Sequence, residues 1–227
     1  MLDAGAIETV YDRLSHTYPI FDDSDDPWIT EGLSATPYRV IVSTALSTVT
    51  HSKRVIRACK ALFPVADDFE TLATLPDDEL RELIRPVAHY NNKTRSIKGM
   101  AQKILDDHNG QIPRTDAELL ALPGIGRKCA DIVMTTLFKT PTVAVDTHVH
   151  RLANRLGMAK SSTHDKTADQ LNDVTPDKYL QHAHEWLIQH GGKICVARKP
   201  RCGDCPLTDL CEYYAEHAGD HTAPANA

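Results

Sequence analysis

Residues 119–131 read Leu-Leu-Ala-Leu-Pro-Gly-Ile-Gly-Arg-Lys-Cys-Ala-Asp, and this stretch carries the strongest information about the fold. Just before it, Thr115 and Glu118 fit the capping-box pattern, which predicts the start of a helix. Pro123 and the glycines after it break that helix, and a second helix is expected to begin near Arg127. The stretch therefore predicts two helices joined by a tight, glycine-containing hairpin.

This hairpin is also a candidate phosphate-binding site. Gly124 and Gly126 let a ligand approach the backbone closely. Ile125, Gly126 and Arg127 come just before and at the start of the second helix, where the backbone N–H groups have no acceptor within the helix. Such groups hold a phosphate without reading the base attached to it. The alternative is an ordinary connection between helices, in which glycine is common for conformational reasons alone.

Lys128 lies in the first turn of the second helix. A positive charge at the N-terminal end of a helix interacts unfavourably with the helix macrodipole, and the neighbouring Arg127 destabilises the protonated form of Lys128 further. A lysine kept partly neutral is a nucleophile that can form a Schiff base with an aldehydic carbon. The alternative is a solvated surface lysine, which is what most lysines are.

Asp146 follows Lys128 by eighteen residues and lies in the segment Val143–His148, which reads Val-Ala-Val-Asp-Thr-His and precedes a helical pattern. Asp146 fits an ordinary helix N-cap. A carboxylate that faced Lys128 would also stabilise an oxocarbenium ion or move a proton. The two roles of Asp146 are compatible.

Outward from these motifs, apolar residues recur at three- and four-residue spacing, for example over residues 40–48 and 80–87. Thr36-Pro37 and the segment Pro76–Glu79 mark further helix starts. Strand signals are sparse, and the best candidate, Thr142–Val145, is short. The pattern predicts an all-α protein.

The composition is that of a globular protein. The chain has 227 residues, of which 41% are hydrophobic and 25% charged, and this excludes wholesale disorder. No apolar run approaches the roughly 18 residues that span a bilayer, and Met1–Val10 lacks the basic-then-apolar order of a secretory signal. We therefore expect a cytoplasmic protein that does not bind membranes. Asp22–Pro27 and the tail after about Tyr214 are expected to be poorly ordered.

The formal net charge is −6, but the charges are unevenly distributed. Residues 1–80 hold 14 acidic and 6 basic side chains, a net charge of −8, whereas residues 81–227 hold 17 acidic and 19 basic ones, a net charge of +2. A polyanion is therefore expected to contact the second part of the chain.

Four of the six cysteines form an uneven ladder. Six residues separate Cys195 from Cys202, two separate Cys202 from Cys205, and five separate Cys205 from Cys211. Clustered cysteines in a cytoplasmic chain indicate a metal centre rather than a disulfide framework. Four thiolates can hold a [4Fe–4S] cluster or tetrahedral zinc, and one close pair with two outlying ligands favours the cluster. Zinc and a disulfide pair remain the alternatives.

The segment Lys193–Arg201, which contains the first of these cysteines, is basic. Lys193, Arg198, Lys199 and Arg201 fall within nine residues that contain no acidic side chain. A solvated surface is the ordinary interpretation of such a run. Beside an acidic N-terminal third, we favour a clamp on nucleic-acid phosphates, with Arg198 and Lys199 as its candidate contacts.

Together these features resemble the endonuclease III family of the helix-hairpin-helix–GPD superfamily of DNA base-excision glycosylases. The resemblance covers about residues 36–212 and rests on Leu122–Lys128, Val145–His148, His184–Gly191 and the cysteine ladder, in this order and spacing. It implies one [4Fe–4S] cluster held by the four cysteines and a hairpin that binds phosphate. His148 matches the family histidine near the flipped base.

The family architecture implies two helical domains that flank a DNA-binding cleft. A six-helix barrel with the hairpin would span residues 30–140, and a cluster domain with a flexible C-terminal tail would combine residues 1–29 and 141–227. The implied partner of this monomeric protein is damaged double-stranded DNA, at the nucleoid if the cell is prokaryotic. The damaged nucleotide would flip into the cleft between Lys128 and Asp146.

The implied activity is removal of oxidised pyrimidines by a bifunctional DNA N-glycosylase and AP lyase. In that mechanism, Asp146 supports departure of the base while Lys128 attacks C1′. The resulting Schiff base acidifies the C2′ proton, and β-elimination then breaks the strand.

Three positions depart from the family pattern near the groups that enter the DNA base stack. Val49 stands where the family commonly has glutamine, and Ser52 where it frequently has aspartate. His89 lies in the Ala88–Asn91 stretch, which supplies a wedge residue in the family. Two alternatives to an enzyme for oxidised pyrimidines therefore stay open. One is a relative specific for mismatches or AP sites, and the other is a weakly active DNA-binding paralogue.

Overall fold

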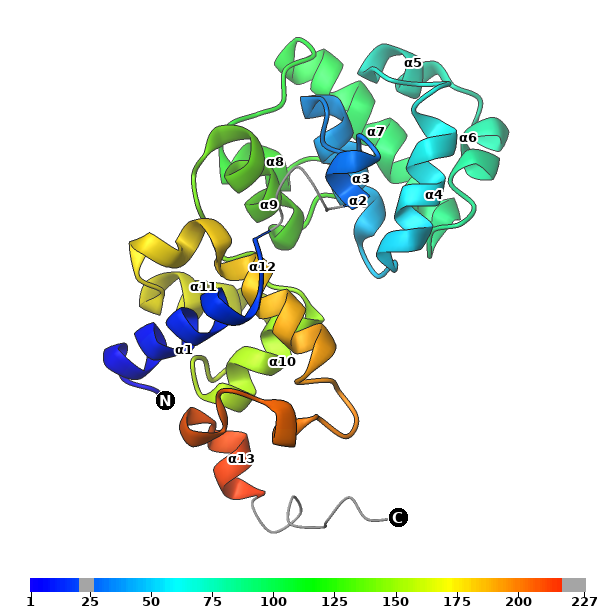
Figure 1. The fold of residues 1–227 in the computed structure, drawn as a ribbon. Helices are drawn as coiled ribbons and strands as arrows, with labels where there is room; N and C mark the ends of the chain where they lie inside the picture. The colour runs from blue at the N-terminus through cyan, green and yellow to red at the C-terminus, as the bar shows by residue number, and fades with distance from the viewer. Residues whose placement is uncertain (21–26, 218–227) are drawn as a thin grey trace, which may run out of the picture. The chain divides into compact units, whose positions relative to one another are not determined.

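The computed structural model describes residues 1–20 and 27–217, and every regular element in these two ranges is a helix (Figure 1). The prediction of an all-α protein is confirmed. The short strand expected over Thr142–Val145 is wrong for these residues: the segment forms no strand, and the Val143 N–H donates to Asn172 Oδ1 at 2.9 Å.

The two segments expected to be poorly ordered fall largely outside the described residues. This applies to residues 22–26 and to the chain after residue 217. Pro27 is the first residue of helix α2 (Pro27–Thr30), and residues 215 and 216 are the last two of helix α13 (Glu212–Glu216), so the expectation is wrong for these positions.

The chain divides into two compact units, Asp22–Thr140 and the combination of Met1–Phe21 with Pro141–Ala227. The first unit contains α2 (Pro27–Thr30), α3 (Pro37–Ser47), α4 (Ser52–Leu62), α5 (Phe69–Thr74), α6 (Asp77–Leu83), α7 (Tyr90–His108), α8 (Asp116–Leu120) and α9 (Arg127–Phe138). Helix α2 therefore belongs to this unit.

Sequence signals near helix starts account for several of these elements. Thr36 caps α3 by accepting the Arg39 N–H at 3.2 Å, with Pro37 as the first helical residue. At α8, Thr115 Oγ1 accepts the Glu118 N–H at 3.3 Å and donates to Glu118 Oε2 at 2.6 Å. Each cap satisfies an N–H group that would otherwise lack an intrahelical acceptor.

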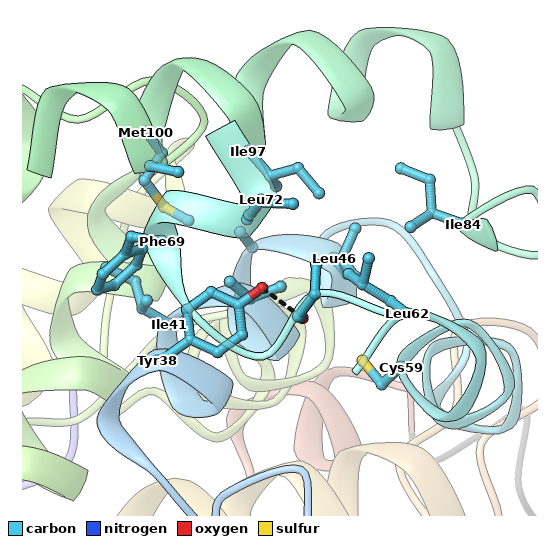
Figure 2. Close-up of a cluster of buried hydrophobic side chains, with 14 of the residues drawn as sticks. Tyr38, Ile41, Leu46, Cys59, Leu62, Phe69, Leu72, Ile84, Ile97 and Met100 are labelled. Carbon is cyan, nitrogen blue, oxygen red and sulfur yellow. Dashed lines mark hydrogen bonds between the residues drawn. The ribbon is translucent and has the colours of Figure 1, made fainter. Parts of the chain in front are cut away.

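The core of the 22–140 unit is built by α3, α4, α5 and the long helix α7 (Figure 2). Ile41, Leu62, Leu72 and Met100 are fully buried in it, and each such side chain stabilises the fold by about 1.5–3 kcal/mol. The Tyr38 hydroxyl donates to Ala66 O at 2.9 Å, so this aromatic ring is buried without an unsatisfied polar atom.

The other unit joins the N-terminal helix to the C-terminal part of the chain. It contains α1 (Ala4–Thr17), α10 (Thr147–Leu156), α11 (His164–Val174), α12 (Asp177–Lys193), the short 3₁₀ helices η1 (Cys202–Asp204) and η2 (Thr208–Leu210), and α13 (Glu212–Glu216). Its separate core includes Tyr11, Leu14, Leu152 and Leu187. Arg13 of α1 forms an ion pair with Asp209 and also donates to Pro206 O, both within the cysteine-rich segment.

None of the helices in the described residues is both long enough and apolar enough to cross a membrane.

Candidate functional site

The predicted hairpin lies between α8 and α9 and requires glycine at Gly124. This residue has φ +82°, and a Cβ added to it would lie 2.8 Å from the Cβ of Ser96 on α7. Gly126 is extended and leaves the start of α9 without a side-chain cap. Ile125 is only 5% exposed, so its side chain belongs to the core and only its backbone can face a ligand. The turn therefore presents backbone where a phosphate would bind.

Lys128 is the second residue of α9 and is half-buried. The next residue, Cys129, is buried, and its Sγ lies 3.7 Å from Thr44 O of α3. The Arg127 guanidinium donates to Asp131 Oδ1 at 3.1 Å, and Asp131 has only 2% of its side chain exposed. The buried carboxylate of Asp131 therefore partly neutralises the charge of Arg127. The sequence alone did not indicate this ion pair, which weakens the expected effect of Arg127 on the ammonium group of Lys128.

Val49 and His89 lie at the tips of two loops of the same unit. Both have left-handed backbone conformations, with φ +52° and φ +55°. Val49 is 83% exposed and His89 is also exposed. The loops are joined by a hydrogen bond from the Ala88 N–H to Thr50 Oγ1 at 3.0 Å. Val49 and His89, two of the three residues that depart from the family pattern, are thus carried by loops that contact one another.

Asp146 is the N-cap of α10 in the other unit. Its Oδ1 accepts the N–H groups of His148 at 2.8 Å and Val149 at 2.9 Å. The structural interpretation of Asp146 as an N-cap is therefore confirmed. Because Lys128 and Asp146 belong to different units, their pairing stays a prediction.

His148, in the first turn of α10, lies where α10 and α12 approach closely. A Cβ added to Gly191 of α12 would lie 2.9 Å from His148 O, so this helix contact requires glycine. Arg151 Nη2 donates to Gly191 O at 2.6 Å and lies 3.4 Å from His148 Nδ1. Neither Arg151 nor Gly191 was singled out as a candidate site residue from the sequence, because what each does depends on a residue some 40 positions away.

The four cysteines of the ladder form no disulfide with one another and line one cavity. Apolar and aromatic side chains from α10 and α13 form much of its remaining wall, including Leu152, Leu156, Tyr213 and Tyr214. No group of three or more His, Cys, Asp or Glu side chains within residues 1–20 and 27–217 is arranged around a single metal ion. Burial, with a smaller contribution from the neighbouring sulfurs, raises the pKa of Cys205 to about 11.

This donor set fits an inorganic cluster that takes four thiolates. Four sulfurs in one apolar cavity are poorly stable as bare anions, and a cationic cluster core supplies the missing positive charge. Polar groups around the cavity are placed to donate hydrogen bonds to ionised sulfur. Arg155 Nη1 lies 3.5 Å from Cys195 Sγ, and the buried His190 has Nε2 3.4 Å from Cys205 Sγ. Tyr18 Oη lies 3.0 Å from His190 Nδ1, so a neutral imidazole can accept there and donate its other N–H to sulfur.

The basic segment Lys193–Arg201 is only partly available to an external anion. Arg201 forms an ion pair with Asp204 at 2.8 Å, and Lys193 donates to Gln189 Oε1 at 3.0 Å. Arg198 and Lys199 are exposed, and neither forms an ion pair with any residue in the described ranges. These two side chains are the ones left to contact a phosphate.

Comparison with known proteins identifies the relatives of this chain. The family of HhH-GPD superfamily base excision DNA repair proteins matches residues 42–177, and the iron-sulfur binding domain of endonuclease III matches residues 195–211. The second match contains all four cysteines of the cavity. The prediction of a [4Fe–4S] cluster is confirmed by this match.

Curated relatives and solved structures agree with these family matches. The chain is 36% identical over 197 residues to endonuclease III of Rickettsia felis (87% of this chain, 92% of the relative). It is 38% identical over 179 residues to endonuclease III of Escherichia coli K12 (79% of this chain, 85% of the relative). A structure of a trapped endonuclease III–DNA covalent intermediate superposes with a TM-score of 0.86 at 30% identity, covering 96% of this chain and 100% of that chain. The chain belongs to the endonuclease III family of the HhH-GPD superfamily and is a base-excision-repair DNA glycosylase and AP lyase with a [4Fe–4S] cluster.

Proposed function

We propose that this enzyme removes oxidised pyrimidines from double-stranded DNA and then cuts the strand through a Schiff base on Lys128. The observation that carries the proposal is the position of Lys128, in the first turn of α9 directly after a hairpin whose backbone is open to a phosphate. A phosphate held by that hairpin would bring the adjoining sugar within reach of the lysine amine. One related structure is a trapped endonuclease III–DNA covalent intermediate, which supports covalent chemistry in the family.

In the proposed mechanism, the neutral amine of Lys128 forms a bond to C1′ as the bond between C1′ and the base breaks. The base leaves with that electron pair, and a proton neutralises it. The Asp146 carboxylate stabilises the positive charge that develops on the sugar. Opening of the sugar ring gives the Schiff base, loss of the C2′ proton follows, and the 3′-phosphate leaves in β-elimination.

We assign the 22–140 unit to the six-helix barrel domain, and the unit of residues 1–21 and 141–227 to the cluster domain. The four cysteines would hold the cluster, which stabilises the fold and positions DNA without taking part in bond cleavage. Damaged double-stranded DNA would be the partner of a monomeric enzyme that works in the cytoplasm, at the nucleoid in a prokaryote.

The proposed DNA contacts fall into three groups. The backbone of the Gly124–Gly126 turn and the side chain of Arg127 hold phosphates on one domain, as Arg198 and Lys199 do on the other. His148 lies beside the flipped base. Val49 and His89 enter the space that the flipped nucleotide leaves in the duplex.

Borohydride trapping tests the role of Lys128. Lys128→Gln should abolish the covalent complex with an abasic-site duplex while DNA binding stays within a few fold, because the lost group is a nucleophile and not a main phosphate contact. Lys139 of the same unit is exposed and offers a matched control, since Lys139→Gln should trap normally. Covalent capture that persists in Lys128→Gln would place the nucleophile on another residue.

The lesion specificity is tested separately with a panel of duplexes. Each contains one oxidised pyrimidine, one mismatch or one abasic site, and single-turnover excision is measured on all of them. Faster excision of the oxidised pyrimidines than of the mismatched bases supports the proposal. Cleavage restricted to abasic sites would contradict it.

A further inference from the structure

Lys93, in the first turn of α7, is a buried lysine that the mechanism above does not use. Its side chain is only 8% exposed, and its Nζ donates to Leu46 O at 2.7 Å, Thr48 O at 2.6 Å and Thr50 Oγ1 at 3.0 Å. An ammonium group has three N–H donors, so each of its hydrogens has an acceptor. Burying a charge is costly without such partners, and this complete set indicates a fixed structural task.

All three acceptors belong to the end of α3 and the loop that carries Val49. Leu46 O and Thr48 O lie at the C-terminal end of α3, where the helix macrodipole favours a cation. Thr48 and Thr50 flank Val49 on both sides. Lys93 therefore holds the two ends of the loop tip while the Val49 side chain stays exposed.

The Lys93 side chain is connected to the loop that carries His89 through Thr50, and the backbone of Lys93 makes the first helical bond after that loop. Its backbone N–H donates to His89 O at 3.0 Å, and the Ala88 N–H donates to Thr50 Oγ1 at 3.0 Å. The Thr50 hydroxyl thus accepts one hydrogen bond from Lys93 and one from Ala88. A single lysine and a single hydroxyl connect the two loop tips.

Both tips have backbone conformations that need such support. A β-branched residue such as Val49 rarely has a positive φ, and a strained conformation of this kind persists only where the surrounding contacts maintain it. His89 has a positive φ as well and serves as the N-cap of α7 without a side-chain cap bond. Without the bonds from Lys93 and Thr50, we expect each tip to relax toward negative φ.

We propose that Lys93 is a positioning residue that clamps the Val49 and His89 loops together, so that both side chains enter the DNA duplex as one preformed wedge. This rests on the proposed function, in which Val49 and His89 fill the space left by the flipped nucleotide. Loops that are already ordered lose less conformational entropy when their side chains enter the duplex. This advantage applies only to the step in which the base stack opens.

The electrostatics agree with a clamp that is charged at neutral pH. Burial lowers the pKa of Lys93 to about 8; the thiol of Cys129 on α9 opposes this shift, and the charge of Arg54 on α4 adds to it. The three acceptors favour the protonated amine, which alone can donate to all of them.

The test uses Lys93→Met and Thr50→Val, with Thr50→Ser as the conservative rescue and Lys98→Met as the matched control. Lys98 is another partly buried lysine of α7, but it donates to Leu75 O and Asp77 Oδ1, away from both loops. The readout is the fluorescence of 2-aminopurine placed opposite the lesion, which reports opening of the stack, followed by single-turnover excision. Circular dichroism and the Tm establish that each variant is folded.

We expect Lys93→Met and Thr50→Val to slow stack opening and excision by about tenfold, the factor that corresponds to 1.4 kcal/mol of lost preorganisation. The Kd for undamaged duplex should change much less. Thr50→Ser and Lys98→Met should behave as the wild type does.

Wild-type stack opening in a folded Thr50→Val or Lys93→Met would overturn the clamp. If Lys93→Met does not fold, Thr50→Val decides alone, because it removes only the hydroxyl that joins the loops. If the wild type itself excises no oxidised pyrimidine, the proposed lesion range fails, and the clamp is then judged from 2-aminopurine fluorescence opposite an abasic site.

Discussion

At Asp146, one carboxylate oxygen makes both of the bonds that cap α10. Oδ1 accepts the His148 and Val149 N–H groups, while Oδ2 takes no part in the cap. The structural and the proposed catalytic roles of this residue therefore fall on different atoms. Substitutions that keep the cap and remove the charge can separate the two roles.

Asp146→Asn should leave stability nearly unchanged, because asparagine caps helices as well as aspartate does, whereas Asp146→Ala should cost ~1 kcal/mol. Base excision should fall strongly in both variants, since neither has a carboxylate to stabilise the developing positive charge. Cleavage of a preformed abasic site should fall much less. Urea unfolding and single-turnover assays measure the two effects. Normal excision by Asp146→Asn would leave Asp146 only its capping role.

The pKa of Lys93 gives a second prediction at the residue scale. An unperturbed lysine has a pKa of about 10.4, so between that pH and about pH 8 the unfolded chain holds a proton that the folded protein lacks. The free energy of unfolding of the wild type, relative to that of Lys93→Met, should therefore rise from pH 8 to about 10.4 and stay level below pH 7. Urea titrations of both proteins across this range measure the difference. A difference that falls with rising pH would mean that folding raises the pKa of this lysine.

At the scale of elements, the α8–α9 hairpin contains two glycines with different roles. Gly124 has a left-handed backbone and no room for a Cβ, whereas Gly126 is extended and has no atom within 4 Å of an added Cβ. The first glycine is required by conformation and packing against Ser96. The second leaves backbone open to a ligand.

Gly124→Ala should lower stability by roughly 1–3 kcal/mol, since alanine is strained at a positive φ and its Cβ would clash with Ser96. Gly126→Ala is the matched control and should be nearly neutral for folding. Thermal unfolding measures both, and a Ser96→Gly, Gly124→Ala double variant should recover the part of the loss that is due to the clash. Equal Tm values for the two single variants would contradict this account of the turn.

At the scale of the whole molecule, each compact unit has a hydrophobic core of its own. The cavity of the four cysteines is lined partly by Leu152 and Leu156, which also belong to the core that includes α1 and α12. The cluster is therefore expected to stabilise that unit and to leave the core of the 22–140 unit intact.

Cys205→Ser should reduce bound iron and raise amide exchange in α10, α12 and the 194–211 segment, while α3, α7 and α9 stay protected. Cys129→Ser is the control, because this buried thiol lies in the 22–140 unit and should not affect iron content. Iron analysis and hydrogen exchange followed by mass spectrometry provide the measurements. Loss of protection throughout the chain would show that the two cores unfold together.

Local features of the sequence predict much of the fold. The helix starts at Thr36 and Thr115, the break at Pro123–Gly126 and the cap at Asp146 depend on residues within four positions of one another, so the sequence itself displays them. The cysteine ladder is local in the same sense. The strand expected over Thr142–Val145 is wrong, because β-branched residues predict an extended backbone but not the presence of a neighbouring strand.

The remaining features depend on which distant segments pack together. Lys93 lies in a polar stretch of α7, and nothing in its neighbourhood indicates that its ammonium would meet carbonyls 45 and 47 positions earlier. Likewise, Arg151 and Gly191 acquire their roles only where α10 approaches α12. The sequence by itself determined the all-helical class, the hairpin, the four thiols and the family chemistry, because caps, turn residues and ligand spacing act over short distances along the chain. Only the tertiary structure decided which charges are buried and which loops are tied together, because these depend on contacts between residues far apart in sequence.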